Sequence, residues 1–260
     1  MNHPTSLRND QRRVLETSRR WKTLFVVACL TLASFSYLNS ASALVIGVSG
    51  PRATGISNLL TTGGHTVSVF GSVSNSAIDY AGLDVYILER TVGTSALGDF
   101  VRGGGLLVTE WDASAWALNT ENLLNATDSG GGFIGTSTPV TFNAEGLVAG
   151  LGTGLPNPYS ESGGTEFFRT FAGIGADVDI LATRPGNIAA IIGGASGLGN
   201  TLIIGYDWAD NLGTNNTQML LNAVNFQNNG DLSVPEPGAL TLLGIGLIGL
   251  GIAKRRRTSA

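Results

Sequence analysis

Residues 83–110, LDVYILERTVGTSALGDFVRGGGLLVTE, carry the pattern that decides the fold. An apolar run at 83–89 and a second at 106–110 are typical of buried strands. Between them, residues 94–101 have the apolar spacing of a helix, and three glycines at 103–105 end it. A strand, a helix and a strand in this order predict a βαβ unit with parallel strands.

The same alternation extends on both sides of this unit. Before it, we expect strands at 44–48 and 65–70 and helices at 56–60 and 74–81. After it, apolar runs at 178–182, 188–192 and 201–206 are separated only by short turns, which predicts an antiparallel meander, and a last helix begins near Asn215. The sequence therefore predicts one α/β domain over residues 44–230. We expect three layers with a mainly parallel, flavodoxin-like sheet and a late antiparallel extension.

Two glycine-rich regions interrupt this regular pattern. Residues 111–176 are rich in Gly, Asn, Ser and Thr and show no clean period, which is typical of a functional or decorated insert. Residues 193–200, which include GGASGLG, lie between two strands instead of opening a helix. We therefore expect a flexible hairpin there, not a phosphate cradle, and we expect no cofactor.

The element order over residues 44–227 resembles the class I glutamine amidotransferase-like fold, including its trehalose-utilisation relatives. In the enzymes of that superfamily a cysteine follows the fourth strand, where this sequence has Thr109-Glu110-Trp111-Asp112-Ala113. No serine stands there in a Gly-x-Ser-x-Gly elbow either. The histidine that the resemblance implies is also missing. His65, the one histidine of the predicted domain, opens the second strand, at an edge of the sheet where that histidine is not expected. The resemblance therefore implies the fold without the amidotransferase chemistry.

The basic residues are concentrated at the two ends of the chain. Of the 15 Lys and Arg, six lie in residues 1–22 and four in residues 254–257. Residues 44–230 have five arginines, no lysine and fifteen acidic side chains, a net charge of −10 against −4 for the whole chain. Because binding to phosphates needs clustered Lys and Arg, we expect no nucleic-acid partner. The low charged fraction, 13%, also argues against a cytosolic housekeeping enzyme.

Residues 1–43 have the pattern of an export signal. A basic region up to Lys22 is followed by an apolar run at 24–33 and then by Ala41-Ser42-Ala43, a small-x-small site for signal peptidase. The alternative is an uncleaved membrane anchor, but the apolar run is shorter than the ~20 residues that span a bilayer. We predict cleavage before Leu44. It removes Cys29, the single cysteine, and so excludes thiol catalysis and disulfides in the mature protein.

Residues 231–260 combine three features in a fixed order. Pro235, Glu236 and Pro237 precede an uncharged apolar stretch at 239–253, and a basic cluster follows it: Lys254, Arg255, Arg256 and Arg257. By the positive-inside rule, we expect that cluster to stay in the cytoplasm and the α/β domain to lie on the other side of the inner membrane. This order resembles the PEP-CTERM sorting signal of Gram-negative bacteria. The resemblance implies that an exosortase recognises Pro-Glu-Pro and removes the tail, and that the protein associates with exopolysaccharide and biofilm matrix. A plain C-terminal anchor is the alternative.

In open parallel sheets, ligands bind outside the carboxyl ends of the strands. We call this edge the rim, and the sequence places several charged and aromatic side chains there. Ser49 and Arg52 follow the first strand, and Arg90 follows the third. The candidate ligand-binding residues are Glu89, Glu110, Trp111, Asp112, Asp207, Trp208 and Asp210.

Three interpretations of these residues remain open. The first is a solvated acidic rim with Trp111 and Trp208 packed on a loop. The second is a binding site for a carbohydrate or for Ca²⁺, although no metal-ligand set is identified. The third is a hydrolase in which two carboxylates act as acid and base on glycans. We favour a non-catalytic protein that passes through the inner membrane and ends at the cell surface or in the extracellular matrix.

Overall fold

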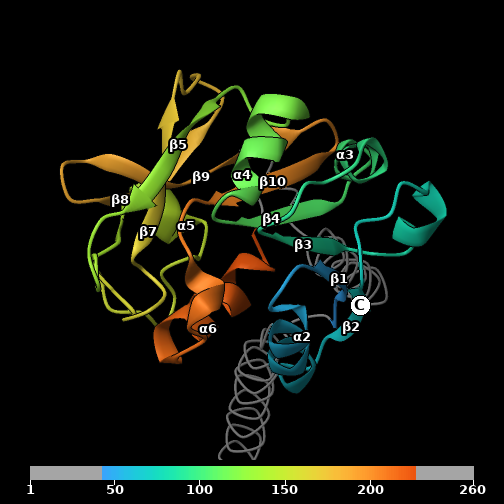
Figure 1. Cartoon of the computed structure of the whole chain (residues 1–260), viewed down its shortest axis with the longest axis horizontal. Helices are drawn as coiled ribbons and strands as arrows, with labels where there is room; N and C mark the ends of the chain where they lie inside the picture. Colours follow the sequence, from blue (N-terminus) through green and yellow to red (C-terminus); the bar gives the residue numbers. More distant parts are fainter. Residues whose placement is uncertain (1–42, 227–260) are drawn as a thin grey trace, which may run out of the picture. The chain divides into compact units, whose positions relative to one another are not determined.

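The computed structural model describes residues 43–226 (Figure 1). The helices found in this range lack the length and hydropathy of a membrane span. The predicted export signal, residues 1–43, lies outside the described range apart from its last residue. The predicted sorting signal, residues 231–260, lies wholly outside it. The structure therefore concerns the predicted α/β domain alone.

The first half of the domain alternates strands with helices, as the sequence predicts. Its elements are β1 (Val45–Ser49), α2 (Ala53–Thr62), β2 (Thr66–Phe70), η1 (Ala77–Tyr80), β3 (Val85–Glu89), α3 (Ser95–Arg102) and β4 (Leu106–Glu110). Thr94 begins α3 as its N-cap, where its hydroxyl accepts a hydrogen bond from the Leu97 amide.

The second half contains the insert and the predicted meander. The insert is formed by α4 (Ala113–Ala115), the π-helical turn η2 (Trp116–Thr120), β5 (Thr127–Phe133), β6 (Thr141–Phe142), α5 (Ala144–Val148) and β7 (Phe167–Ala172). The rest is formed by β8 (Asp179–Arg184), β9 (Ile188–Ser196), β10 (Gly199–Ile204), η3 (Trp208–Asp210) and α6 (Thr214–Ala223).

One eight-stranded sheet, in the order β2-β1-β3-β4-β10-β9-β8-β6, organises these elements. The strands β2, β1, β3, β4 and β10 are mutually parallel, whereas β10, β9, β8 and β6 pair antiparallel. The predicted fold class, a mainly parallel α/β sheet with an antiparallel extension, is confirmed.

Helices cover both faces of the sheet and give the three expected layers (Figure 1). The helices α2 and α6 pack on one face, where Ile56, Leu60 and Met219 are buried against Ile46, Val48 and other strand residues. The helix α3 and the turn η2 pack on the other face, with Leu97 and Trp116 in its core. The central strands β3 and β4 are buried along their whole length because both faces are covered.

The glycine-rich run after residue 192 forms a hairpin between β9 and β10, as predicted, but most of its residues belong to the two strands and not to the turn. The strand β9 continues to Ser196, and only Gly197 and Leu198 lie between it and β10. A Cβ on Gly193 would lie 2.7 Å from the Phe226 ring and 2.8 Å from a Leu181 methyl group. Glycine is therefore needed there for close packing on a strand, which composition does not distinguish from a loop.

The insert places a two-stranded sheet, β5 and β7, beside the rim. This sheet is connected to the end of β10 by backbone contacts. Phe168 forms a bridge with Tyr206, and the Arg169 amide donates to the Gly205 carbonyl at 2.6 Å. The insert thus brings side chains from residues 127–172 to the carboxyl ends of the main strands.

Candidate functional site

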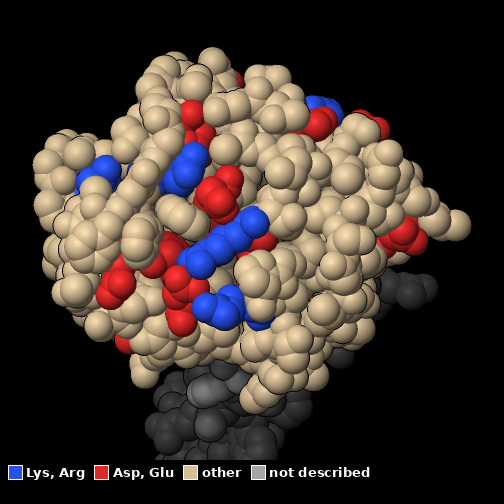
Figure 2. Space-filling model, in the orientation of Figure 1, with Lys and Arg blue, Asp and Glu red and all other residues tan. Residues whose placement is uncertain are grey.

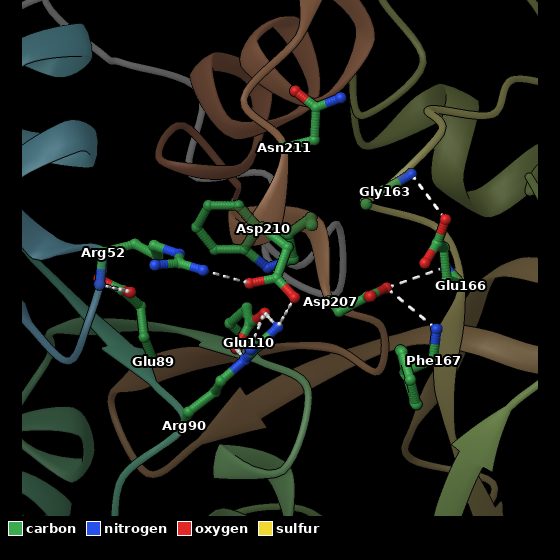
Figure 3. Close-up of polar contacts among 12 residues, drawn as sticks. Arg52, Glu89, Arg90, Glu110, Gly163, Glu166, Phe167, Asp207, Asp210 and Asn211 are labelled. Atoms are coloured by element: carbon green, nitrogen blue, oxygen red, sulfur yellow. Dashed lines mark hydrogen bonds and ion pairs between the residues drawn. The ribbon is translucent and has the colours of Figure 1, made fainter. Parts of the chain in front are cut away.

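Charged side chains form a band across one face of the domain, where basic and acidic groups touch (Figure 2). Three ion pairs lie at the rim. Arg52 pairs with Asp210 at 3.2 Å, and Arg90 pairs with Glu110 at 3.0 Å and with Asp210 at 2.7 Å. The structure therefore joins the ends of β1, β3, β4 and η3 in one network of alternating charge (Figure 3).

Arg90 is the centre of this network. It stands directly after β3 with a left-handed backbone, φ 39°, which is uncommon for a residue other than glycine. Its Nε and Nη2 donate to the Glu110 carboxylate at 3.0–3.2 Å, and its Nη2 also contacts Asp210. Its Nη1 makes none of these contacts. Arg90 thus covers the buried Glu110 and joins it to Asp210.

Glu89 and Glu110 are register partners on adjacent parallel strands, so the two carboxylates are neighbours on one face of the sheet. Both residues are fully buried. Burial raises the pKa of Glu89 to about 7 against the opposing effect of the Arg52 amide. Burial also raises the pKa of Glu110 to about 8, although Arg90 lowers it. Two neighbouring buried carboxylates therefore have pKa values near neutrality, Glu110 under Arg90 and Glu89 beside the Arg52 amide.

Glu89 also has a structural role at the start of α2. One of its oxygens accepts a hydrogen bond from the Arg52 amide at 2.7 Å, at the N-cap position of that helix. Its other oxygen, Oε1, is buried without a hydrogen-bond partner among the described residues. An internal carboxylate thus fills the N-terminus of α2, a position that in other proteins often holds an anionic ligand.

A row of aromatic rings leads away from Arg90. The Arg90 guanidinium lies 5.0 Å from the centre of the Trp111 ring. The Trp111 and Phe167 rings are 5.7 Å apart, and the Phe167 and Phe133 rings are 5.4 Å apart, both with edge-to-face geometry. Phe133 is 56% exposed. We call Trp111, Phe167 and Phe133 the aromatic row; it runs from the rim onto the β5–β7 sheet.

Trp111 has a left-handed backbone, φ 43°, at the first residue after β4. This is the turn at which the amidotransferase resemblance would require a cysteine. Its Nε1 is buried without a hydrogen-bond partner among the described residues. His65, in turn, is buried beside β2, at the far edge of the sheet, and its Nδ1 accepts a hydrogen bond from the Leu44 amide at 3.2 Å. The sharp turn after β4 is therefore present, but the cysteine and the histidine of the amidotransferase enzymes are not.

Two further candidate residues, like Glu89 and Glu110, lie inside the domain instead of on the rim surface. Trp208 is fully buried, and its Nε1 donates to the Thr109 carbonyl at 3.3 Å, so its ring has no free face for a ligand. Asp207 is 1% exposed and accepts hydrogen bonds from the Glu166 and Phe167 amides at 3.0 and 3.1 Å (Figure 3). Both residues connect the end of β10 to its neighbours.

The acidic candidates do not gather around a common point. Glu110 and Asp210 contact arginines, Asp207 contacts backbone amides, and Asp112 has a buried Oδ1 without a partner among the described residues. Within residues 43–226 there is no group of three or more His, Cys, Asp or Glu side chains that could hold a metal ion. At the rim the carboxylates instead pair with arginines, as Glu110 and Asp210 do with Arg90.

A second buried ion pair was not anticipated from the sequence. Asp128 on β5 accepts hydrogen bonds from Arg169 on β7 at 2.9–3.2 Å and from the Gly130 amide at 2.7 Å. The Ser114 hydroxyl contacts the same carboxylate and also the Trp111 carbonyl. This cluster attaches the β5–β7 sheet to the turn after β4. Its only sequence signals are one Asp and one Arg, 41 residues apart in an irregular segment.

A cavity of about 710 Å³ lies at the end of the sheet opposite the rim, where the parallel strands begin. Its two carboxylates already have partners within the described part of the chain. Asp84 accepts a hydrogen bond from the Val45 amide at 2.8 Å, and Asp99 pairs with Arg102 at 3.5 Å. The rim is the better candidate site because Arg52 and Arg90 join its carboxylates in one ion-pair network and because burial raises the pKa of Glu89 and Glu110.

Residues 233–257 match the model of the PEP-CTERM protein-sorting motif. The match includes Pro-Glu-Pro, the apolar stretch and the basic cluster. The motif implies sorting by an exosortase and export. No curated protein has a sequence that matches this chain.

The described domain is similar to several solved structures. The cytoplasmic proteins STM3548 and STM1381 of Salmonella typhimurium each superpose with a TM-score of 0.54, at 12% and 11% identity. Both similarities cover 70% of this chain, and they cover 97% and 95% of the two Salmonella chains. A ThuA-like protein from Bacteroides uniformis has a TM-score of 0.53 and 12% identity, over 72% of this chain and 93% of that chain. These similarities confirm the resemblance in fold.

Proposed function

We propose that the chain is an exported protein whose rim binds carbohydrate without catalysis, at the cell surface or in the extracellular matrix. The single observation that carries this proposal is the aromatic row beside the Arg90 network. Exposed aromatic faces pack on sugar rings, and paired arginines and carboxylates supply donors and acceptors for hydroxyl groups. The sorting motif supports the location, because an exosortase substrate reaches the compartment that holds exopolysaccharide.

Substitution of the aromatic row tests carbohydrate binding. We expect Phe133→Ala and Trp111→Ala, made in the full chain and purified in detergent, to weaken retention on extracted exopolysaccharide about tenfold, which corresponds to about 1.4 kcal/mol. Phe133 is the cleaner test because its ring is half exposed. Leu198→Ala is the matched control, since Leu198 is 85% exposed at the β9–β10 turn, away from the rim. Equal retention of all three variants and the unmodified chain would contradict the proposal.

A glycan hydrolase is the second candidate, and the adjacent carboxylates Glu89 and Glu110 favour it. A general acid in a glycosidase needs a raised pKa, and both groups have one. If the rim is catalytic, the chain releases sugar from a glycan panel and Glu110→Gln abolishes that release. The non-catalytic proposal expects no release by the unmodified chain under conditions in which the polysaccharide is retained.

A further inference from the structure

A small cavity of about 370 Å³ opens beside Arg90, on the side of the α4–η2 segment. Its lining includes Arg90, Val92, Asp112, Ala115, Trp116 and Asn119. The volume lies at the lower end of the ~300–1,000 Å³ typical of small-molecule sites. A single small ligand unit fits this volume better than a stretch of polymer.

Three backbone irregularities surround this cavity. Arg90 and Trp111 have left-handed backbones directly after two adjacent strands, and Trp116 begins the π-helical turn η2. Residues in such conformations persist where surrounding contacts enforce them, and they cluster at functional sites, as π-helical turns also do. The loop after β3 lies directly on the turn, because a Cβ on Gly93 would be 2.5 Å from the Trp116 ring. The cavity is therefore built by packed, well-defined segments.

The polar groups of the cavity suit hydroxyl groups. Asp112 lines the cavity with its carboxylate, whose Oδ1 is itself buried and has no hydrogen-bond partner among the described residues. Arg90 also lines the cavity, and its guanidinium pairs with Glu110 and Asp210 through Nε and Nη2. Asn119 is already occupied, since its side chain donates to the Asp128 carbonyl and accepts from the Asp128 amide. A carboxylate and a guanidinium thus flank a space of restricted size.

We propose that this cavity is a subsite for one neutral sugar unit at the end of a glycan chain. The inference rests on the proposed carbohydrate binding by the rim. Arg90 lines the cavity and also stacks on Trp111, so a chain whose last unit fills the cavity continues along the aromatic row. The Asp112 carboxylate disfavours a uronic acid in the cavity, because the Arg90 charge is already balanced.

Titration calorimetry of the full chain in detergent tests the subsite. The probes are glucose and galactose, with glucuronate and galacturonate as their anionic counterparts. We expect at least one neutral hexose to bind ten times more tightly than its uronate. Ala115→Phe fills the cavity, and we expect it to abolish hexose binding. Asp112→Asn keeps the shape of the side chain, and we expect it to reduce the tenfold preference to less than threefold.

The outcomes separate this inference from the proposed function. Equal binding of hexose and uronate by the unmodified chain, or unchanged hexose binding by a folded Ala115→Phe variant, overturns the subsite. Absence of hexose binding by a chain that is retained on exopolysaccharide overturns the subsite and leaves carbohydrate binding by the rim standing. Absence of retention overturns both. If Ala115→Phe fails to fold, the unmodified chain and Asp112→Asn still decide the hexose preference.

Discussion

Glu89 and Trp208 show what single residues at the rim contribute beyond their position in the sequence. Both were predicted to face a ligand because they stand at or just after strand ends. Glu89 instead caps α2 from a fully buried position, and Trp208 fills the core beneath Thr109. A strand end predicts where a side chain emerges, but packing with distant segments decides whether it reaches the surface.

The buried Glu89 predicts a pH dependence of stability. Because its folded pKa of about 7 lies above the unfolded value, its contribution is fully present below about pH 4 and is lost as the pH rises through 7. The raised pKa values of Glu110 and Asp207 act in the same direction. Urea unfolding should give a free energy of unfolding that falls between pH 5 and pH 8.5, by roughly 2–3 kcal/mol from Glu89 alone.

The variant Glu89→Gln isolates that contribution. It keeps an oxygen for the Arg52 amide and removes the charge, so we expect a flatter pH profile of the unfolding free energy. Asp99→Asn is the control, since the Asp99 side chain is 76% exposed. Identical profiles for the Glu89→Gln variant and the unmodified chain would show that burial of this carboxylate has no energetic cost.

Alanine at Trp208 and at Trp111 should affect different properties: Trp208→Ala should lower the free energy of unfolding, whereas Trp111→Ala should weaken retention on exopolysaccharide. Removing the buried Trp208 ring is expected to lower the free energy of unfolding by about 3–5 kcal/mol, as for other large core side chains. Trp208→Phe, which keeps most of the packing, should cost less. For a Trp208→Phe variant that folds, we expect normal retention on exopolysaccharide. A selective loss of retention would place Trp208 in the binding site after all.

At the scale of elements, the sheet was predictable and the insert was not. Strands such as β3 and β4 are continuous apolar runs, so their identity and pairing follow from the sequence. The strand β5, with the sequence TDSGGGF, has neither apolar alternation nor β-branched residues beyond Thr127. It pairs with β7, and Asp128 contacts Arg169 on that strand across 41 residues of sequence, a contact that no local pattern indicates. The aromatic row could not be predicted for the same reason.

The Asp128–Arg169 pair should control the position of the β5–β7 sheet. Arg169→Met leaves the Asp128 charge buried and unpaired, and breaking a buried pair in this way costs about 3–5 kcal/mol. Hydrogen exchange should therefore show loss of protection in β5 and β7, with weaker retention on exopolysaccharide. The double variant with Asp128→Asn removes the unpaired charge and should recover part of the protection. Unchanged exchange in the single variant would argue against this role.

At the scale of the whole molecule, charge separates the two basic ends of the sequence from the acidic domain between them. The ends carry ten of the 15 basic residues, and the sorting motif at 233–257 accounts for four of them. The acidic domain has its five arginines, of which Arg52, Arg90 and Arg169 form ion pairs at or beside the rim. Composition therefore predicts where the chain goes, and only the folded structure indicates what its rim can hold.

Mass spectrometry of the protein recovered from the native cell surface tests the processing. We expect an N-terminus at Leu44 and a C-terminus that lacks Lys254, Arg255, Arg256 and Arg257. Pro235→Ala combined with Pro237→Ala should leave the tail in place, because the exosortase motif is lost. A native protein that still carries Arg255–Arg257 would refute removal of the tail.

The most direct test of carbohydrate binding by the rim is hydrogen–deuterium exchange of the full chain with and without the extracted exopolysaccharide. We predict protection in peptides that contain Arg90, Trp111, Phe133 and Phe167. Exchange should be unchanged in peptides that contain residues 103–105, which line the 710 Å³ cavity at the opposite end of the sheet. Protection confined to the strand starts, or no protection at polysaccharide concentrations that saturate retention, would contradict a carbohydrate site at the rim.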